Sequence, residues 1–343
     1  MGVLDSMSYN KFNVMHWHMT DSQAFPLESK SYPKLWDGSY TTYERYIQND
    51  VRDIIEYAKN LGIRVIPEFD MPGHATSWCK GYPEICPSPS CQSPLNVAAN
   101  ATWQLLNGFI AEMAKLFPDD HMHLGGDEVN TNCWTQTPSI VAWMQSMGFN
   151  STQALQYFDE GAINIANESN KTVINWDELW TEFGSSGTLD ASKVIIQVWH
   201  GGAEASEIMT AATAAGFRVI YSEDPNWYLD QLSKTWQDRY VVEPYVFLPD
   251  NVSQQKLVLG GEACMWGETV DVSDIQQTIW PTAAAVGERL WSARSVNSTA
   301  LAEPRMQYFR CLMNQRGIAA APPKNAQERS APPGAGSCYA QRR

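Results

Sequence analysis

Short apolar, β-rich runs alternate with longer stretches of helical periodicity along most of this chain. The runs predict seven strands, at residues 12–18, 63–69, 121–124, 172–176, 194–199, 218–221 and 257–260. Helices are predicted between and after them, at residues 42–61, 98–117, 152–169, 203–215, 275–291 and 300–316. Strands that alternate with helices in this way are typical of a parallel α/β fold.

Polar and aromatic residues follow the C-terminal ends of six of these strands. They are His16-Trp17-His18 with Asp21; Glu68, Asp70 and His74; Asp127-Glu128; Trp176-Asp177-Glu178; Trp199-His200; and Glu262, Trp266 and Glu268. A (β/α)8 barrel builds its active site from the loops at that face. No G-x-G-x-x-G or Walker sequence follows the first strand, which counts against an open nucleotide-binding sheet. The pattern therefore favours a barrel.

The strand count is seven, one fewer than a closed barrel needs. Residues 3–8 have the pattern of the end of a helix that leads into the first strand. We therefore expect an incomplete barrel over residues 1–318, lacking one strand and most of a helix at the N-terminus. Residues 319–343 form a tail rich in proline, alanine and glycine.

Composition excludes some classes of function. The formal net charge is −14 and the pI about 4.8, which argues against nucleic acid as a partner because phosphate binding needs basic patches. No run of eighteen apolar residues exists, so the sequence predicts no membrane span.

Two features suggest the secretory pathway. None of the seven cysteines forms a C-x-x-C pair, which favours disulfides over a zinc site. Six N-x-S/T sequons are present, at Asn100, Asn150, Asn167, Asn170, Asn251 and Asn297. Residues 1–15 nevertheless lack the pattern of a signal peptide, so we expect a chain shortened at its N-terminus.

Asp127 and Glu128 are the strongest candidates for chemistry. They end the segment His-Met-His-Leu-Gly-Gly-Asp-Glu, in which two glycines allow a sharp turn after a strand. Glycosidic cleavage uses one carboxyl as a proton donor and a second group to stabilise charge at the anomeric carbon. Neighbouring residues do not easily reach opposite faces of a sugar, and one alternative is that the substrate supplies its own nucleophile. The plain alternative makes Asp127 a helix cap and Glu128 a surface residue.

A metal-dependent barrel hydrolase is a further alternative. His16 and His18 lie on the same face of a strand, as the first ligands of a zinc site would. Only four other histidines could complete such a site, namely His74, His121, His123 and His200. We expect no metal and no cofactor.

The segment from His121 to Glu128, with Val129-Asn130, resembles the H-x-G-G-D-E signature of glycoside hydrolase family 20, the β-N-acetylhexosaminidases. Further matches follow in order at residues 11–18 with Asp21, 67–74, 176–178, 227–230, 261–268 and 286–291. The resemblance covers essentially the whole chain and is strongest to the eukaryotic lysosomal and plant enzymes.

The resemblance implies an exo-acting, retaining enzyme that removes terminal N-acetylhexosamine (GlcNAc or GalNAc) through an oxazolinium intermediate. Glu128 would be the general acid and base, Asp127 would orient the acetamido group, and Tyr228 would bind its carbonyl oxygen. The substrate-binding residues would be Trp176, Trp199, Trp266, Asp230 and Glu268, with Asp21 and His74 as supporting residues. Asp230 followed by the uncharged Gln231 implies a neutral sugar.

The resemblance also implies how the cysteines pair and where the protein works. Cys311 would pair with Cys338, Cys133 with Cys91 or else Cys86, and Cys264 would be a buried thiol. A lysosomal, vacuolar or secreted location and a homodimer are further implications. The family's sugar-clamping arginine on the first barrel strand is absent, so a non-catalytic carbohydrate-binding remnant or partner subunit stays an alternative.

Overall fold

The computed structural model describes residues 1–248, 251–323 and 338, and the chain divides into two compact units. One unit comprises Val14–Gln197 and is called the N-terminal unit below. The other combines Met1–Asn13 with Val198–Arg343 and is called the C-terminal unit.

The N-terminal unit is built on parallel strands that pair in chain order. They are β1 Val14–Thr20, β2 Arg64–Phe69, β3 His121–His123, β4 Thr172–Trp176 and β5 Val194–Val198, whose last residue lies beyond the boundary of the unit. The register places Glu68 of β2 beside His18 of β1 and beside His123 of β3. Paired residues of parallel strands project to the same side, so these three side chains gather at one point.

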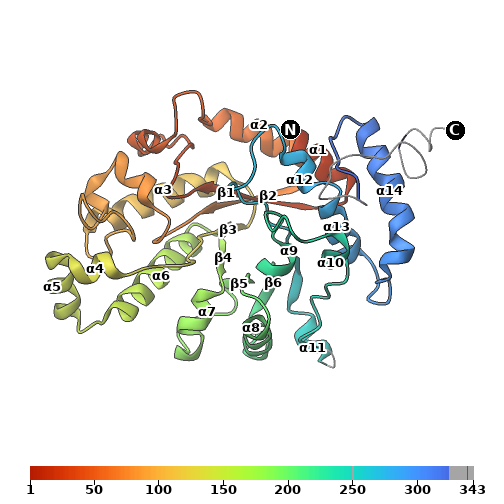
Figure 1. The fold of residues 1–343 in the computed structure, drawn as a ribbon. Coiled ribbons are helices and arrows are strands. Elements are labelled where there is room, and N and C mark those ends of the chain that lie inside the picture. The colour runs from red at the N-terminus through yellow and green to blue at the C-terminus, as the bar shows by residue number, and fades with distance from the viewer. Residues whose placement is uncertain (249–250, 324–337, 339–343) are drawn as a thin grey trace. The chain divides into compact units, whose positions relative to one another are not determined.

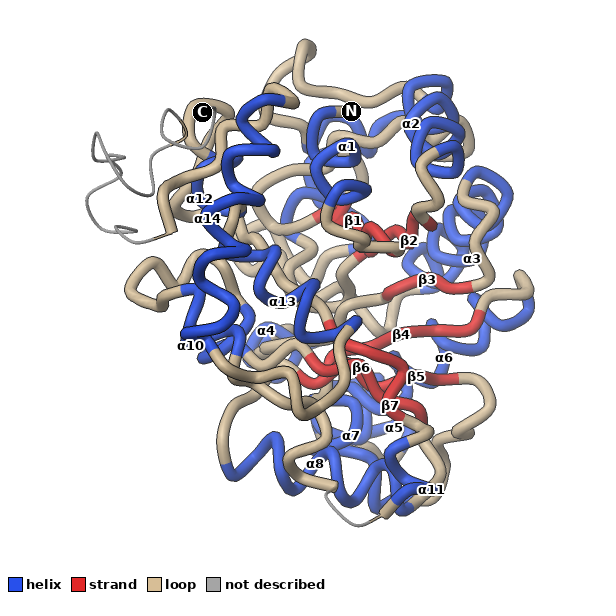
Figure 2. The backbone as a smooth tube through the Cα atoms, turned by 90° about the vertical axis from the view of Figure 1, so that its right-hand side faces the viewer, coloured by secondary structure: helices blue, strands red, loops and turns tan. Residues whose placement is uncertain are grey.

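Helices α2, α3 and α6 lie together on one side of these strands (Figures 1 and 2). Helix α3 turns Leu105, Phe109 and Met113, spaced four residues apart, into the core. The helices of this unit are α2 Gln48–Asn60, α3 Asn100–Leu116, α4 Asn132–Gln136, α5 Pro138–Met147, α6 Ser151–Glu168 and α7 Glu178–Phe183. Short 3-10 helices are η1 Pro33–Gly38, η2 Thr76–Lys80, η3 Pro83–Ile85 and η4 Gly184–Ser186.

The C-terminal unit contains the parallel pair β6 Arg218–Tyr221 and β7 Val258–Gly261. Its helices are α1 Gly2–Tyr9, α8 Ala203–Ala214, α9 Asp224–Trp227, α10 Trp236–Tyr240, α11 Val252–Gln255, α12 Ile275–Ile279, α13 Thr282–Trp291 and α14 Thr299–Gln315. One core cluster centres on Trp280 and Met313. A second cluster packs Trp236 of α10 against Ala285 of α13 and Met306 of α14.

The strands confirm the predicted fold class, an incomplete (β/α)8 barrel with seven parallel strands among the described residues. The bounds of β4 and β6 are those predicted, and the other strands differ by at most two residues at either end. Of the predicted tail, residues 324–337 and 339–343 lie outside the described part of the chain.

Two predicted helices were wrong in extent. The helix predicted from residue 42 begins at Gln48, because the backbone of Tyr46 pairs with Pro26 and Glu28 in a β-bridge region. The helix predicted over residues 275–291 is two helices, α12 and α13, that are separated at Pro281. Proline has no N–H to continue the hydrogen-bond ladder of α12, so a new helix begins after it.

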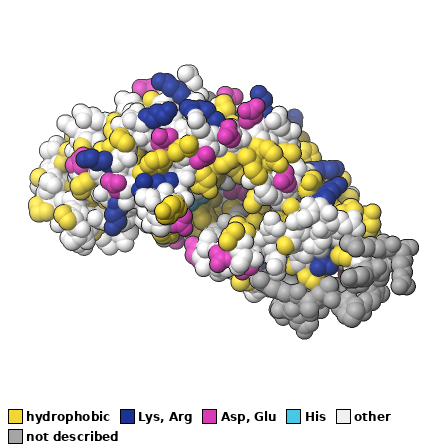
Figure 3. Space-filling view, turned by 90° about the horizontal axis from the view of Figure 1, so that it is seen from above, with side chains coloured by type: hydrophobic (Ala, Val, Ile, Leu, Met, Phe, Trp, Pro, Cys, Tyr) yellow, Lys and Arg dark blue, Asp and Glu magenta, His cyan; other side chains and the backbone are white. Residues whose placement is uncertain are grey.

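Charged side chains of both signs are interspersed with hydrophobic ones on the face that Figure 3 shows, so negative charge is not gathered into one patch there. Within the described ranges, no helix is both long and apolar enough to cross a membrane.

Candidate active site

Glu68 is the centre of a buried network of histidines at the ends of β1, β2 and β3. Its carboxylate lies 2.8 Å from His16 Nε2, 2.7 Å from His18 Nδ1 and 3.2 Å from His123 Nδ1. The indole N–H of Trp176 donates to the same carboxylate at 2.9 Å. Burial alone would raise the pKa of Glu68, but the three imidazoles outweigh it and hold the pKa well below its usual value. Glu68 is therefore a buried anion with several compensating donors.

The network continues outward from Glu68 to Asp21. His18 Nε2 lies 2.8 Å from Asp21 Oδ2, so one imidazole bridges a fully buried carboxylate and a partly exposed one. Burial lowers the pKa of His18, but Glu68 and Asp21 raise it well above the ordinary value. Asp21 is thus fixed by a cationic histidine.

His74 connects the interior carboxylate Asp70 to the two predicted catalytic carboxylates. Its Nδ1 lies 2.8 Å from Asp70 Oδ2 and 3.5 Å from Asp127 Oδ2, and its Nε2 lies 3.6 Å from Glu128 Oε2. The hydrogen bond that His74 donates to Asp70 raises the pKa of His74 to about 9, although burial opposes the rise. His74 is therefore a cation beside Asp127 and Glu128 at neutral and acidic pH.

The two glycines before Asp127 let the chain pass against Asp70. Gly125 has a φ of +68°, and a Cβ at this position would lie 1.9 Å from Asp70 Oδ1. Gly126 donates its backbone N–H to the same oxygen at 3.0 Å. Asn175 of β4 donates to the Gly125 carbonyl at 2.9 Å. A side chain on Gly125 would push the loop, and with it Asp127 and Glu128, away from this position.

Asp127 and Glu128 have opposite environments although they are adjacent in the chain. The Asp127 side chain is 14% exposed, whereas that of Glu128 is 64% exposed. Burial, followed by the nearby Asp70 and Glu68, raises the pKa of Asp127 well above its ordinary value. Asp127 Oδ1 is buried and has no hydrogen-bond partner among the described residues. A ligand N–H placed against this oxygen would find a buried acceptor.

Tyr228 is the centre of an aromatic cluster in the C-terminal unit. Its ring centroid lies 6.4 Å from that of Trp199, at an interplanar angle of 20°, and 5.9 Å from that of Trp266. Leu229, the next residue, donates its N–H to the Cys264 carbonyl at 2.7 Å. These contacts bring together three of the predicted sugar-binding aromatic residues. Trp176, the fourth, is in the N-terminal unit and is 1% exposed.

Asp230 lies two residues after Tyr228, and the carboxylate of Glu268 influences its pKa. Burial, and to a smaller degree the carboxylates of Glu268 and Asp224, raise the pKa of Asp230. Its Oδ1 is buried without a hydrogen-bond partner among the described residues. The side-chain amide of the next residue, Gln231, donates to Asp224 Oδ1 at 2.9 Å. Position 231 itself carries no positive charge.

Three histidine–carboxylate groups in the N-terminal unit have the donor types of a metal site. They are His16, Glu68 and His123; His18, Asp21 and Asp70; and Asp70, His74 and Asp127. The histidine nitrogens and carboxylate oxygens contact each other directly, at 2.7–2.8 Å for the shortest pairs. Direct charge-assisted hydrogen bonds account for this close approach.

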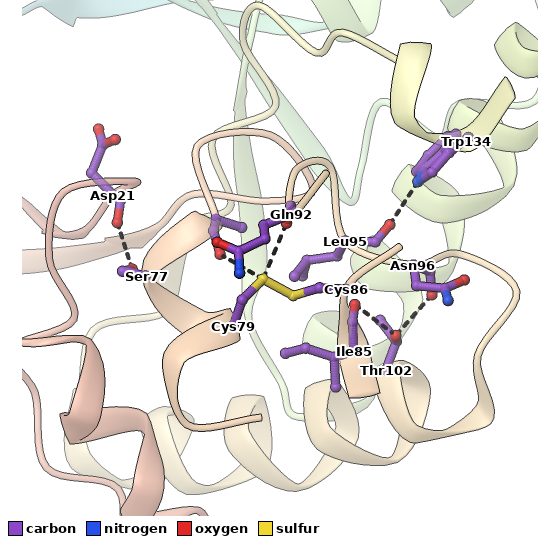
Figure 4. The surroundings of a disulfide bond; sticks show 11 residues. Asp21, Ser77, Cys79, Ile85, Cys86, Gln92, Leu95, Asn96, Thr102 and Trp134 are labelled. Carbon is purple, nitrogen blue, oxygen red and sulfur yellow. Dashed lines mark hydrogen bonds between the residues drawn. A yellow bond between two sulfur atoms is a disulfide. The ribbon is translucent and has the colours of Figure 1, made fainter. Parts of the chain in front are cut away.

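Disulfides hold the segment that follows His74. Cys79 pairs with Cys86, and Cys91 with Cys133, which is the first of the two partners that we predicted for Cys133. Figure 4 shows the surroundings of Cys79–Cys86, where Ser77 donates its hydroxyl to the Asp21 carbonyl at 2.5 Å. The predicted Cys311–Cys338 bond is also confirmed. Cys264 is buried outside these disulfides, and its thiol donates to Glu262 at 3.5 Å.

Comparison with known proteins decides the family. The model of "Glycosyl hydrolase family 20, catalytic domain" matches residues 1–294. The chain belongs to glycosyl hydrolase family 20. Among relatives of this family 20 protein, beta-hexosaminidase 1 of Arabidopsis thaliana is 48% identical over 343 residues, covering 99% of the chain and 62% of the relative. Beta-hexosaminidase subunit beta of Homo sapiens is 42% identical over 331 residues, covering 93% of the chain and 58% of the relative.

Solved structures of family 20 proteins share the fold. A chitobiase from Flavobacterium johnsoniae superposes with a TM-score of 0.83 at 27% identity, covering 96% of this chain and 50% of its own. An exo beta-N-acetylglucosaminidase from Vibrio harveyi also gives a TM-score of 0.83, at 22% identity, and covers 94% of this chain and 56% of its own. The family 20 chain described here thus spans less than two thirds of the length of these relatives.

Sequence reasoning assigned no role to Glu68 or Asp70, although both stood in a motif that it singled out. Both are fully buried, and between them they contact four histidines. The available signal was the alternation of His16 and His18, which face a common carboxylate on the neighbouring strand.

Proposed function

We propose that the protein hydrolyses terminal, non-reducing N-acetyl-β-hexosaminides with retention of anomeric configuration, using the substrate's own acetamido group as nucleophile. The observation that carries the proposal is the pair Asp127 and Glu128. One carboxyl is buried and has an unused oxygen, and the next is exposed and next to a cationic histidine. The names of the relatives agree, since several are beta-hexosaminidases.

Asp127 would act on the acetamido group. Its buried Oδ1 would accept the amide N–H, which orients the carbonyl oxygen for attack on the anomeric carbon. Positive charge develops on the acetamido group as the oxazolinium ring closes, and an adjacent carboxylate stabilises it electrostatically. This role needs the anionic form of Asp127. The cation His74, 3.5 Å away, favours that form. Burial and the carboxylates of Asp70 and Glu68 oppose it and raise the pKa of Asp127.

Glu128 would transfer the protons. In the first step it donates a proton to the glycosidic oxygen as the bond to the leaving group breaks. In the second step its carboxylate takes a proton from water, the water oxygen bonds to the anomeric carbon, and the oxazolinium ring opens to restore the acetamido group. Its 64% exposure leaves room for a leaving group and then for water.

The aromatic and acidic residues of the C-terminal unit would bind the sugar. Tyr228 would donate to the acetamido carbonyl, and Trp199 and Trp266 would pack on apolar faces of the sugar, with Trp176 against the acetamido methyl. Asp230 and Glu268 would accept sugar hydroxyls. Because this segment offers carboxylates and the neutral Gln231, an anionic 6-sulfated sugar would be repelled. We therefore propose neutral GlcNAc or GalNAc termini as substrates, in a lysosomal, vacuolar or secreted setting.

Release of 4-nitrophenol from its N-acetyl-β-glucosaminide at about pH 4.5–5, beside a Glu128→Gln variant, tests the proposal. We expect turnover that falls at least about 10²-fold in the variant. Equal rates for both proteins would contradict the assignment of Glu128. Binding of a thiazoline analogue of the intermediate without turnover would instead favour a carbohydrate-binding role. Faster hydrolysis of the 6-sulfated substrate would contradict the preference for neutral sugars.

A further inference from the structure

The peptide group between Tyr228 and Leu229 is held at both of its polar ends. The Tyr228 carbonyl accepts a hydrogen bond from Arg239 Nη2 at 2.8 Å, and the Leu229 N–H donates to the Cys264 carbonyl at 2.7 Å. The Tyr228 Cα lies in the plane of this peptide group. Hydrogen bonds at both ends therefore limit how the backbone that carries the Tyr228 side chain can turn.

Arg239 ties together the two ends of the segment 228–231. The same Nη2 atom that donates to Tyr228 also donates to the Gln231 carbonyl, at 3.2 Å. Asp230 lies between these two carbonyls in the chain. One side chain thus holds the short segment that carries both Tyr228 and Asp230, to which the proposed function gives sugar-binding roles.

Helix α10 gives the Arg239 side chain a fixed origin. Thr235 and Asp238 form a capping box at the start of this helix. The indole N–H of Trp227, the residue before Tyr228, donates to the Arg239 carbonyl at 3.2 Å. The helix and the segment are therefore joined twice, through the backbone of Arg239 and through its guanidinium.

Arg239 is a cation in a buried position. It is 1% exposed, and burial lowers its pKa to about 10, so it stays charged at neutral pH. Its Nε and Nη1 have no hydrogen-bond partner in the described part of the chain. Burying a charge with so few partners costs free energy that a hydrophobic side chain would avoid. What the guanidinium supplies, and a hydrophobic side chain would not, is the pair of hydrogen bonds to the segment 228–231.

We propose that Arg239 is a positioning residue for the hydrolysis, and that its guanidinium holds the segment 228–231 so that Tyr228 and Asp230 stay in place to bind the sugar. The proposal rests on the proposed function, which gives these two residues their roles. Arg239 acts through their backbone. Its loss should therefore reduce what Tyr228 contributes to turnover.

Hydrogen–deuterium exchange of the ligand-free whole chain tests the positioning by itself, by mass spectrometry of peptides that contain Leu229. Arg239→Met should exchange the Leu229 amide at least about tenfold faster than the parent, because local opening becomes easier. Arg239→Lys keeps a cationic donor without the guanidinium fork and should fall between the two. Arg289→Lys is the matched control, since Arg289 is a buried arginine of the same unit that donates to the Val296 carbonyl at 3.0 Å. It should leave Leu229 exchange unchanged.

Kinetics with 4-nitrophenyl N-acetyl-β-glucosaminide test whether this positioning serves the sugar site. We expect kcat/KM to fall at least about tenfold in Arg239→Met and to recover in part in Arg239→Lys. Tyr228→Phe should lower kcat/KM at least about tenfold in the parent and in Arg289→Lys, but only about twofold when added to Arg239→Met. A role in stability alone would leave the effect of Tyr228→Phe the same in every background.

Either an unchanged Leu229 exchange rate in Arg239→Lys or an undiminished effect of Tyr228→Phe in that background would overturn the proposal. The test therefore stands even if Arg239→Met fails to fold. A parent protein without turnover would instead contradict the proposed function, and the exchange measurement would still decide whether Arg239 holds the segment 228–231.

Discussion

Replacing His74 should remove one pH-dependent contribution from the free energy of unfolding. The pKa of His74 is about 9 in the folded protein and 6.5 in its unperturbed state. A folded-state pKa above the unfolded value means that protonation stabilises the fold. The contribution is complete below pH 6.5 and disappears as the pH rises through 9. The difference between the two pKa values corresponds to about 3 kcal/mol of unfolding free energy.

The assay is urea denaturation of the parent and of His74→Gln at several pH values between 6 and 9.5, followed by tryptophan fluorescence. The stability difference between the two proteins should shrink by about 3 kcal/mol across this window. Asp70→Asn, which removes the carboxylate 2.8 Å from His74 Nδ1, should remove the same dependence, and the double variant should add little. A stability difference that stays constant from pH 6 to 9.5 would show that protonation of His74 does not stabilise the fold.

Three further predictions follow from single contacts. Gly125→Ala should lower the free energy of unfolding by about 3 kcal/mol or more, because its Cβ would lie 1.9 Å from Asp70 Oδ1. Gly148→Ala, also at positive φ but with nothing within 4 Å, should lower it by about 1 kcal/mol. Thermal unfolding compares the two variants, and equal losses would contradict the steric argument. Asp127→Asn should raise the free energy of unfolding at pH 7 by about 1 kcal/mol, because the folded-state pKa of Asp127 is raised and the carboxyl therefore stabilises the fold less as the pH rises. Turnover of the variant should fall at least about 10²-fold. A variant less stable than the parent would show that the buried charge is well compensated. Removing the Cys91–Cys133 disulfide, which spans 42 residues, should lower the free energy of unfolding by about 4 kcal/mol, against about 2 kcal/mol for Cys79–Cys86, which spans 7. Chemical denaturation of the two double Cys→Ala variants compares these losses. A larger loss for Cys79–Cys86 would contradict the loop-entropy explanation.

The strands could be predicted closely because they are short, apolar runs bounded by polar residues. β4 and β6 have the predicted bounds, and the polar residues after the strands include those that form the site. The helix boundaries near Tyr46 and Pro281 could not be placed from periodicity alone. Tyr46 pairs through its backbone with a segment twenty residues earlier, and such a long-range contact leaves no periodic signal.

The candidate site, like the fold, could be predicted only in part from the sequence. Asp127 and Glu128 could be named from the sequence because their types and spacing fit a chemical need, and His74 could be named from the family resemblance. The direction of each pKa could not, since it depends on which carboxylates lie against which imidazoles in three dimensions. Asp70 illustrates this: its position beside both Gly125 and His74 follows from the packing of two loops.

In the proposed mechanism the substrate's acetamido oxygen is the nucleophile. A series of N-acetyl, N-fluoroacetyl, N-difluoroacetyl and N-trifluoroacetyl β-glucosaminides with one leaving group tests it most directly, because fluorine makes that oxygen progressively less nucleophilic. We expect kcat/KM to fall steadily along the series. Rates that are independent of fluorination would contradict it and would mean that an enzyme carboxylate or water attacks the anomeric carbon.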